Sequence, residues 1–269
     1  MKLKQKFPWT LSFVLEWWPN MNLRSVLRLR DYEIRNERGE AVAGKLLTLK
    51  MRSPVKGDVT FREVGSDILT FTEVFKEQAY RVVSDHVREC NTVIDLGAST
   101  GLTTLYLAAH YPGCKFLAVE PHPGSYQVML RNLKDLIQEG RCRTLKAAVW
   151  EKDTMLVGAP PDYPEHYSVF ATREGTITNE GEVQTIGLSM PAIIANSGFA
   201  KIDVLKIDIE GAEVQLFKGD LSWLSKVQGI AIAFHGDSRE ASGFDGHMRQ
   251  HGFRLIDGGT DTYLALRDA

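Results

Sequence analysis

The pattern of apolar and polar positions changes near residue 91. From there, short continuous apolar runs alternate with segments whose apolar residues recur every three or four positions. Such runs are typical of strands buried on both faces, and their alternation with helices is typical of a parallel sheet. We therefore predict an α/β fold with a final hairpin that adds one antiparallel strand. The strands are expected at residues 92–97, 115–121, 143–150, 203–210 and 229–236, and the hairpin at 254–257 and 262–267.

The first 90 residues follow a different pattern. A helical segment, broken near residues 19–20, carries an aromatic stripe, and two short strands are expected at 45–52 and 58–63. A helix should begin near Ser66 and Asp67, or at the capping box formed by Thr70 and Glu73. Its apolar face would carry Ile68, Phe71, Phe75, Ala79 and Val82. These elements predict an N-terminal helical and β-hairpin extension over 1–65, followed by a main domain over 66–269. The stripe consists of Trp9, Phe13, Trp17 and Trp18.

This aromatic stripe could be an interfacial membrane anchor. A stripe at helical spacing more often packs on its own protein or on a second subunit, which here would give a homodimer through the N-terminal helix. We expect the second arrangement. Between residues 153 and 187 the pattern becomes irregular, with two short strands, and such an insertion beside an α/β sheet is commonly functional.

Composition narrows the class of protein. The chain has 269 residues, of which 43% are hydrophobic, and a net charge of −2, so no global basic field favours nucleic-acid binding. No apolar run reaches the roughly 18 residues of a membrane-spanning helix. The three cysteines have no metal-ligand spacing, and we expect neither a signal peptide nor a disulfide framework. These features predict a cytoplasmic protein.

The first strand of the alternating region ends in a glycine-containing turn, "DLGASTG" at residues 95–101. The turn matches neither the dinucleotide fingerprint nor the phosphate-binding loop of nucleotide hydrolases. Gly97 and Gly101 would let a ligand approach the backbone, and Glu120 closes the second strand, where a carboxylate can bind ribose hydroxyls. Together with Asp95, these residues predict a nucleoside site without phosphates, which suits S-adenosylmethionine. Taken alone, an ordinary tight turn would also explain the glycines.

The stretch "VLKIDIEGAEVQLFKG" at residues 204–219 places charges at alternate positions of an otherwise apolar strand. Lys206, Asp208 and Glu210 share one face, because side chains alternate along a strand. Asp208 and Glu210 fall at the carboxyl end, where ligands bind in open α/β sheets. His235 ends the neighbouring strand, so these three side chains could converge. We expect Lys206 to pair with Asp208 or Glu210, and Glu213 to brace the first turn of the following helix.

Several segments together resemble the FkbM-type methyltransferases, which are S-adenosylmethionine-dependent enzymes of the Rossmann-like class. The likeness spans roughly residues 45–236. It rests on "REVGSDILTFTEVFKEQAY" (62–80), "VIDLGASTGLTTLYLA" (93–108), "AVEPHPGSYQVMLRNL" (118–133), "AAVW" (147–150) and "VLKIDIEGAEVQLFKG" (204–219). The resemblance implies a class I methyltransferase fold with a mostly parallel seven-stranded sheet and a reversed terminal hairpin. It also implies methylation of hydroxyl groups on sugars, lipids or secondary metabolites.

The resemblance also assigns roles to residues. It implies that Asp67 closes the cofactor site, that Glu120 holds the ribose, and that Pro121 flanks the adenine. Ala147 and Ala148 would lie at the adenine edge. The residues implied to line the methionine and ribose end are Asp95, Gly97, Ala98, Ser99 and Gly101. In the irregular insertion, Tyr163, His166 and Tyr167 could stack on a sugar face or an aromatic ring of the acceptor.

Asp208, Glu210 and His235 are the candidate catalytic residues, with two competing roles. Either Asp208 or His235 removes the proton from the acceptor hydroxyl, or all three hold a divalent metal that acidifies it. Metal-free catalysis is favoured here, because no further carboxylate or asparagine is placed to complete a hard-metal shell.

An O-methyltransferase of a small metabolite or glycan is the primary hypothesis. The alternatives are an N-methyltransferase, an NAD-linked oxidoreductase with a divergent turn, and a non-catalytic nucleoside-binding protein. The incomplete dinucleotide fingerprint argues against the oxidoreductase. The charges at 208, 210 and 235 argue against loss of catalysis.

Overall fold

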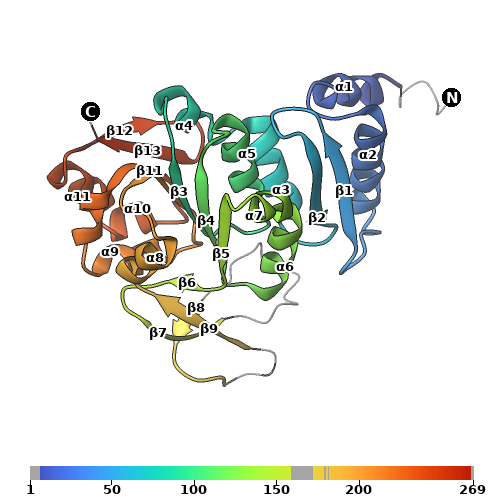
Figure 1. The fold of residues 1–269 in the computed structure, drawn as a ribbon. Helices are drawn as coiled ribbons and strands as arrows, with labels where there is room; N and C mark the ends of the chain where they lie inside the picture. Colours follow the sequence, from blue (N-terminus) through green and yellow to red (C-terminus); the bar gives the residue numbers. More distant parts are fainter. Residues whose placement is uncertain (1–6, 159–171, 179, 181, 268–269) are drawn as a thin grey trace. The chain divides into compact units, whose positions relative to one another are not determined.

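The computed structural model describes residues 7–158, 172–178, 180 and 182–267 (Figure 1). Contacts between residues divide the chain into two compact units, residues 1–78 and 79–269, which are described here one at a time. The sequence predicts a boundary after residue 65, whereas the contacts place it after Gln78. The extra segment therefore packs with the N-terminal elements.

The N-terminal unit combines helices with a two-stranded antiparallel sheet. The predicted break near residues 19–20 separates its first two helices, and Asn22 caps the second by accepting a hydrogen bond from the backbone N–H of Ser25. The strands form a regular hairpin ladder in which Leu49 faces Val59. Its elements are α1 (Phe7–Trp17), α2 (Leu23–Glu37), β1 (Leu46–Met51), β2 (Gly57–Arg62), α3 (Asp67–Thr72) and the π-helical turn η1 (Glu73–Glu77).

An aromatic cluster explains where this unit ends. The ring of Phe71 lies 5.2 Å from each of the rings of Trp17, Phe61 and Phe75, centroid to centroid. Because these rings are buried together, α3 and η1 belong to the core of the N-terminal unit. The single helix predicted from residue 66 was wrong in extent. It is interrupted by η1 and by the left-handed backbone of Gln78, and a separate helix, α4 (Arg81–His86), follows.

The larger unit is built on a seven-stranded sheet, as predicted. The strand order is β12-β13-β11-β10-β3-β4-β5, and all neighbours are parallel except those of β13, which runs antiparallel to β11 and β12. The terminal hairpin thus reverses one strand, which is the expected class I methyltransferase arrangement. The strands are β3 (Thr92–Leu96), β4 (Lys115–Val119), β5 (Cys142–Leu145), β10 (Ile202–Ile207), β11 (Val227–Ala233), β12 (Phe253–Asp257) and β13 (Thr262–Arg267).

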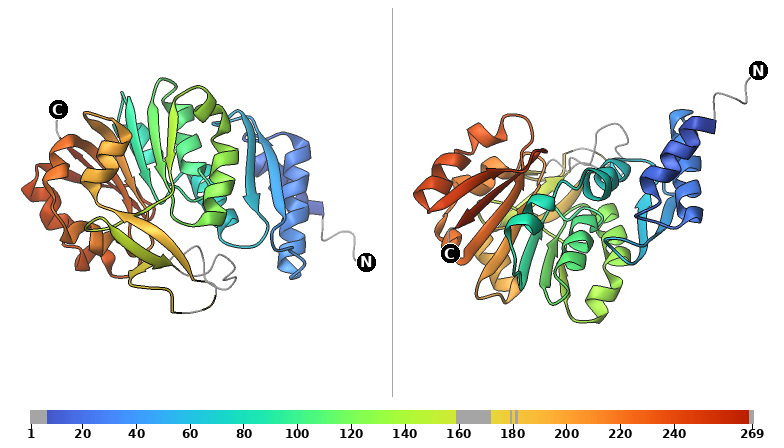
Figure 2. Two further views of the ribbon diagram at one scale, coloured as in Figure 1. Left: turned by 60° about the horizontal axis from the view of Figure 1, so that its bottom comes forward. Right: turned by 90° about the horizontal axis from the view of Figure 1, so that it is seen from above.

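Helices cover both faces of this sheet (Figures 1 and 2). The chain builds outward from β3 to β5, then returns to β10 and builds in the opposite direction. Since strand–helix–strand crossovers are right-handed, the helices of the two halves lie on opposite faces. The helices are α5 (Leu102–His110), α6 (Pro123–Asn132), α7 (Lys134–Gln138), α8 (Met190–Ser197), α9 (Glu213–Lys218), the 3₁₀ turn η2 (Ser222–Lys226), α10 (Ser238–Ala241) and α11 (Phe244–Gln250).

The centre of the sheet supplies the core. Leu205 of β10 lies between Ile94 of β3 and Ile230 of β11 in the parallel register, and all three side chains are fully buried. Covering the strands on both faces explains why they read as continuous apolar runs. The reversal of strand order falls between β3 and β10. In open α/β sheets the carboxyl ends of the strands at such a reversal form a ligand-binding crevice.

A second, smaller sheet interrupts the return from β5 to β10. The strand predicted over 143–150 was wrong in extent, because the chain leaves the main sheet after Leu145 and Ala148 pairs with Gly187 instead. Two short strands were expected in the insertion, and the described residues of this segment contain three. The sheet has the order β6-β9-β7-β8, with β6 (Ala148–Val149), β7 (Thr154–Gly158), β8 (Thr172–Glu174) and β9 (Val183–Leu188). Within the described part of the chain, all helices are too short or too polar to span a membrane.

Candidate active site

Two backbone turns meet at the reversal between β3 and β10. Gly97, which follows β3, has a left-handed φ of +72°, and a Cβ atom built on it would overlap the carbonyl oxygen of Asp208. The backbone N–H of Asp208 in turn donates to the carbonyl of Leu96. Only glycine permits this contact, because any side chain would push the two turns apart. Gly97 thus holds the turn after β3 against the turn after β10.

The turn after β3 is also fixed from β4. Glu120 is buried, and its carboxylate accepts hydrogen bonds from the backbone N–H groups of Ser99 (2.9 Å) and His122 (2.8 Å). Ser99 has a left-handed φ of +48°, which is uncommon for a residue with a side chain. Glu120 therefore joins the carboxyl ends of the two strands and lies at the position predicted for the ribose carboxylate. Pro121 follows it and is partly exposed.

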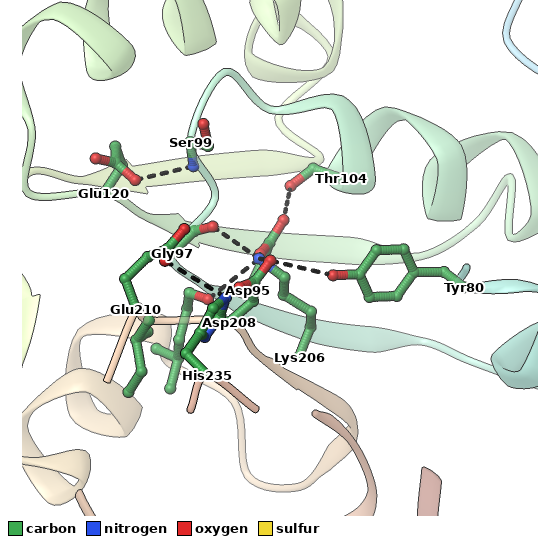
Figure 3. A network of polar contacts seen from close by, with 12 residues as sticks. Tyr80, Asp95, Gly97, Ser99, Thr104, Glu120, Lys206, Asp208, Glu210 and His235 are labelled. Carbon is green, nitrogen blue, oxygen red and sulfur yellow. Dashed lines mark hydrogen bonds and ion pairs between the residues drawn. The ribbon is translucent and has the colours of Figure 1, made fainter. Parts of the chain in front are cut away.

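A buried ion pair lies beneath these turns (Figure 3). The ammonium of Lys206 is 3.0 Å from Oδ1 of Asp95 and 3.6 Å from Oδ2 of Asp208, and it donates hydrogen bonds to the carbonyls of Leu96 (3.3 Å) and Gly97 (2.7 Å). Burial alone would lower the pKa of Lys206, but Asp95 and Asp208 outweigh it and raise the pKa above its usual value. Lys206 is therefore a cation that links both turns.

Asp95 is enclosed within this network. It is fully buried, and its other oxygen accepts a 2.6 Å hydrogen bond from the hydroxyl of Thr104. The expected pairing of Lys206 with Asp208 is present at 3.6 Å, but the nearest carboxylate is that of Asp95, which was not predicted as a partner. Since Asp95 is engaged from two sides, it supports the turn after β3 through Lys206, and direct contact with a ligand stays a prediction.

Asp208, Glu210 and His235 come together as the sequence suggested. Nε2 of His235 lies 3.6 Å from Oδ1 of Asp208 and 3.4 Å from Oε2 of Glu210. The two carboxylates follow β10 and the imidazole follows β11, so adjacent parallel strands deliver all three (Figure 3). Glu210 has a left-handed φ of +55°, a strained conformation that is often found at functional sites. Burial raises the pKa of Glu210.

Glu213 completes the surroundings of His235. It is fully buried on α9, and its Oε1 forms a long hydrogen bond of 3.4 Å with Nδ1 of His235. This bond, opposed by burial and supported by Glu210 and Asp208, raises the pKa of His235 to about 9. Without a metal the imidazole is therefore protonated at neutral pH and cannot accept another proton. Of the two candidate bases named from the sequence, this favours Asp208.

Comparison with known proteins identifies the family. Residues 95–255, more than half of the chain, match the methyltransferase FkbM domain. The chain belongs to the FkbM methyltransferase family. The matched region begins at Asp95 and includes both turns, Glu120, Lys206 and the Asp208, Glu210 and His235 cluster.

Individual FkbM relatives are distant in sequence. The 31-O-demethyl-FK506 methyltransferase FkbM of Streptomyces tacrolimicus is 23% identical over 232 residues, covering 77% of this chain and 89% of the relative. Methyltransferase sdnD of Sordaria araneosa is 25% identical over 175 residues, covering 55% of this chain and 67% of the relative. A solved methyltransferase FkbM from Methylobacillus flagellatus KT aligns with 19% identity and a TM-score of 0.47. The aligned region covers 66% of this chain and 43% of the solved chain.

Membership of the FkbM family implies S-adenosylmethionine as methyl donor, and the geometry fits it. The Gly97 turn brings backbone close to the crevice, and the carboxylate of Glu120 is fixed at the end of β4, where ribose hydroxyls are bound in nucleoside sites. Gly101, with φ of +82°, caps α5, and a Cβ atom built on it would press against Met129 and Leu133. Gly97, Gly101 and Glu120 therefore set the shape of the turn that follows β3.

The remaining predicted site residues lie in different places. Ala98, Ala147 and Ala148 are buried, the latter two where the chain passes from β5 into the second sheet. Asp67 belongs to the N-terminal unit, where its carboxylate accepts hydrogen bonds from the backbone and guanidinium of Arg62, so its role at the cofactor stays a prediction. Tyr163, His166 and Tyr167 lie outside the described residues.

Two residues of this site, Tyr80 and Thr104, were not predicted from the sequence. The hydroxyl of Tyr80 lies 3.4 Å from Oδ2 of Asp208, and Thr104 holds Asp95. Tyr80 ends one of the segments that carried the resemblance, which was the signal that could have drawn attention to it. Thr104 is one of two adjacent threonines in the first turn of α5, and the sequence alone does not show which of them faces Asp95.

Proposed function

We propose that this FkbM-family protein is an S-adenosylmethionine-dependent O-methyltransferase acting on a hydroxyl group of a secondary metabolite, sugar or glycan. The observation that carries the proposal is the convergence of Asp208, Glu210 and His235 beside the cofactor turn. A hydroxyl must lose its proton during methylation, and this cluster supplies carboxylates where the acceptor would enter. The relative from Streptomyces tacrolimicus is named as a 31-O-demethyl-FK506 methyltransferase, which supports oxygen as the acceptor atom.

Different residues of the chain bind the methyl donor and remove the proton of the acceptor. When bound, S-adenosylmethionine supplies an electrophilic methyl carbon, which bonds to the acceptor oxygen as the carbon–sulfur bond breaks and its electron pair stays on sulfur. Glu120 and the Gly97 turn hold the donor, and Lys206 fixes this turn to Asp208. The hydroxyl proton passes to a carboxylate of the cluster. Positioning and proton removal are the two contributions that such an in-line displacement needs.

Calorimetry tests the donor site. The wild-type chain should bind S-adenosylmethionine and S-adenosylhomocysteine, and Glu120→Ala should weaken both by at least about tenfold because the ribose loses a charge-assisted hydrogen bond. Glu139→Ala, which removes an exposed carboxylate at the end of α7, is the matched control. Unchanged affinity in Glu120→Ala would contradict the assigned donor site.

A pair of acceptors tests the acceptor atom. S-adenosylhomocysteine formation is measured with hydroxylated sugars and polyketides and with their matched amine and methyl-ether analogues. An O-methyltransferase should turn over the hydroxyl compounds and not the methyl ethers. Faster turnover of the amines would favour the N-methyltransferase alternative, because a neutral amine needs no strong base to become nucleophilic.

A further inference from the structure

The three side chains of the catalytic cluster are spaced like ligands of one ion. Nε2 of His235 lies 3.4 Å from Oε2 of Glu210 and 3.6 Å from Oδ1 of Asp208, and the three atoms lie within 4.8 Å of one another. Among the described residues, Nδ1 of His235 has a hydrogen bond to Glu213, whereas Nε2 has none to either carboxylate. Two ligand atoms bound about 2.1 Å from a shared ion are roughly 3.0–3.4 Å apart. The 3.4 Å separation falls within this range and the 3.6 Å separation lies slightly above it, so the three side chains are close to the spacing of co-ligands.

Glu213 provides a separate observation on the far side of the ring. Its side chain is fully buried on α9, its Oε1 faces Nδ1 of His235 at 3.4 Å, and its Oε2 has no hydrogen-bond partner among the described residues. The backbone N–H of Ile209 donates to the same Oε1 and keeps the carboxylate in place. A carboxylate behind Nδ1 is the usual companion of a metal-binding histidine, because it fixes the tautomer that leaves Nε2 as the ligand.

We propose that Asp208, Glu210 and Nε2 of His235 bind one divalent metal ion, with Glu213 orienting His235 from behind. Two carboxylates and one imidazole form a mixed oxygen and nitrogen set, which suits a divalent first-row metal such as Mn²⁺. The side chains of Asp208, Glu210 and His235 are each partly exposed, so an ion held by them would keep coordination positions open to solvent. Metal-free catalysis was favoured from the sequence because no further carboxylate or asparagine was placed to complete a hard-metal shell. Glu213 does not fill that place, but it holds the ring of His235 from the Nδ1 side.

What the ion does in the reaction rests on the proposed function. A hydroxyl that binds a divalent cation becomes more acidic, so the acceptor can lose its proton near neutral pH. Asp208, Glu210 and His235 would hold the ion, which would acidify the acceptor hydroxyl. The proton would pass to a carboxylate of the cluster as the methyl carbon bonds to the acceptor oxygen and the carbon–sulfur bond breaks. The products would be the methyl ether, S-adenosylhomocysteine and one proton, which would be released to water.

The competing arrangement is a protonated imidazole held by carboxylates alone. It would draw Nε2 to within about 2.8 Å of one oxygen, as charge-assisted hydrogen bonds are short. It also predicts no metal binding above the background of exposed carboxylates. A direct binding measurement separates the two arrangements and does not depend on knowing the acceptor.

Direct Mn²⁺ binding tests the proposal. The full chain is first treated with a chelator, and binding is then measured as the loss of the electron paramagnetic resonance signal of free Mn²⁺. We expect one Mn²⁺ per chain, at least about a hundredfold weaker binding in Glu210→Gln and His235→Ala, and about tenfold weaker binding in Glu213→Gln. Glu240→Gln, in an exposed carboxylate of α10, is the matched control and should bind like the wild type. Circular dichroism and S-adenosylhomocysteine calorimetry on the same samples report folding and the donor site.

These measurements distinguish the two proposals. If S-adenosylhomocysteine binds and Mn²⁺ does not, or if Glu210→Gln binds Mn²⁺ like the wild type, the metal proposal is overturned and the proposed function stands. Stoichiometric Mn²⁺ binding that is lost in Glu210→Gln supports the metal site, even where S-adenosylhomocysteine fails to bind. Should His235→Ala not fold, Glu210→Gln and Glu213→Gln still decide the outcome, since both keep side-chain shape.

Discussion

The ammonium of Lys206 lies 3.0 Å from the carboxylate of Asp95, and both side chains are almost completely buried. The pair occupies the middle of the sheet, where β10 and β3 place these two residues side by side. Two charges at this depth are tolerated because each also has hydrogen-bonding partners: Lys206 has the carbonyls of Leu96 and Gly97, and Asp95 has Thr104.

Breaking this pair from one side should be costly. Lys206→Met would leave Asp95 as an uncompensated buried charge, so we expect the free energy of unfolding to fall by about 3–5 kcal/mol. The double variant Lys206→Met, Asp95→Asn should recover part of that loss. Urea unfolding of the two single variants and the double variant gives the coupling energy, and simple additivity would show that the pair is not the origin of the effect.

The hydroxyl of Thr104 offers a smaller test of the same network. Thr104→Val keeps the shape but removes the 2.6 Å hydrogen bond to Asp95, and it should lower the free energy of unfolding by about 1–3 kcal/mol. The adjacent Thr103 is also buried in α5 and makes no such bond to Asp95, which makes Thr103→Val the control. Equal losses for the two variants in thermal unfolding would contradict a specific role for Thr104.

The contact between the two turns predicts an unusual cost at one glycine. Gly97→Ala combines a left-handed φ with overlap on the Asp208 carbonyl, so it should both destabilise the fold and move the two turns apart. We expect the affinity for S-adenosylhomocysteine to fall at least about tenfold. Gly140 has nearly the same φ, +69° against +72°, but open space around its Cα. Gly140→Ala should therefore cost only about 1–2 kcal/mol of stability and leave calorimetric affinity unchanged. Wild-type affinity in Gly97→Ala would refute the close contact.

An acid-sensitive ion pair lies in the N-terminal unit. Glu63 accepts two 2.8 Å hydrogen bonds from the guanidinium of Arg35, and these, opposed by burial and supported by Lys45, lower the pKa of Glu63 to about 2. Because the pKa is depressed in the folded state, its stabilisation is fully present above the unfolded value of about 4.3 and is lost as pH falls toward 2.

The expected loss over this pH range is up to about 3 kcal/mol, which Glu63→Gln should abolish because glutamine does not titrate. Melting temperatures of both proteins between pH 5 and 2.5 give the measurement. Parallel melting curves for the wild type and Glu63→Gln across that range would show that Glu63 does not titrate as inferred.

The sequence was sufficient to place Asp208, Glu210 and His235 together, because parallel strands end at the same edge of a sheet and all three residues follow strand ends. It could not identify Asp95 as the partner of Lys206. That pairing depends on the register between β10 and β3, which packing of the whole sheet sets. The second sheet was missed for a similar reason: β6 pairs with β9 almost forty residues later, and no local pattern encodes such a partner.

The contact between Gly97 and the Asp208 carbonyl also constrains how the family can diverge. An insertion in the turn after β3 or in the turn after β10 would separate the proposed donor side of the site from the acceptor side. A change in the length of one turn therefore requires a matching change in the other. The described part of the crossover between β5 and β10 forms a separate sheet of β6, β7, β8 and β9. New acceptor specificities should therefore arise by remodelling that crossover, while the two turns are inherited as a single unit.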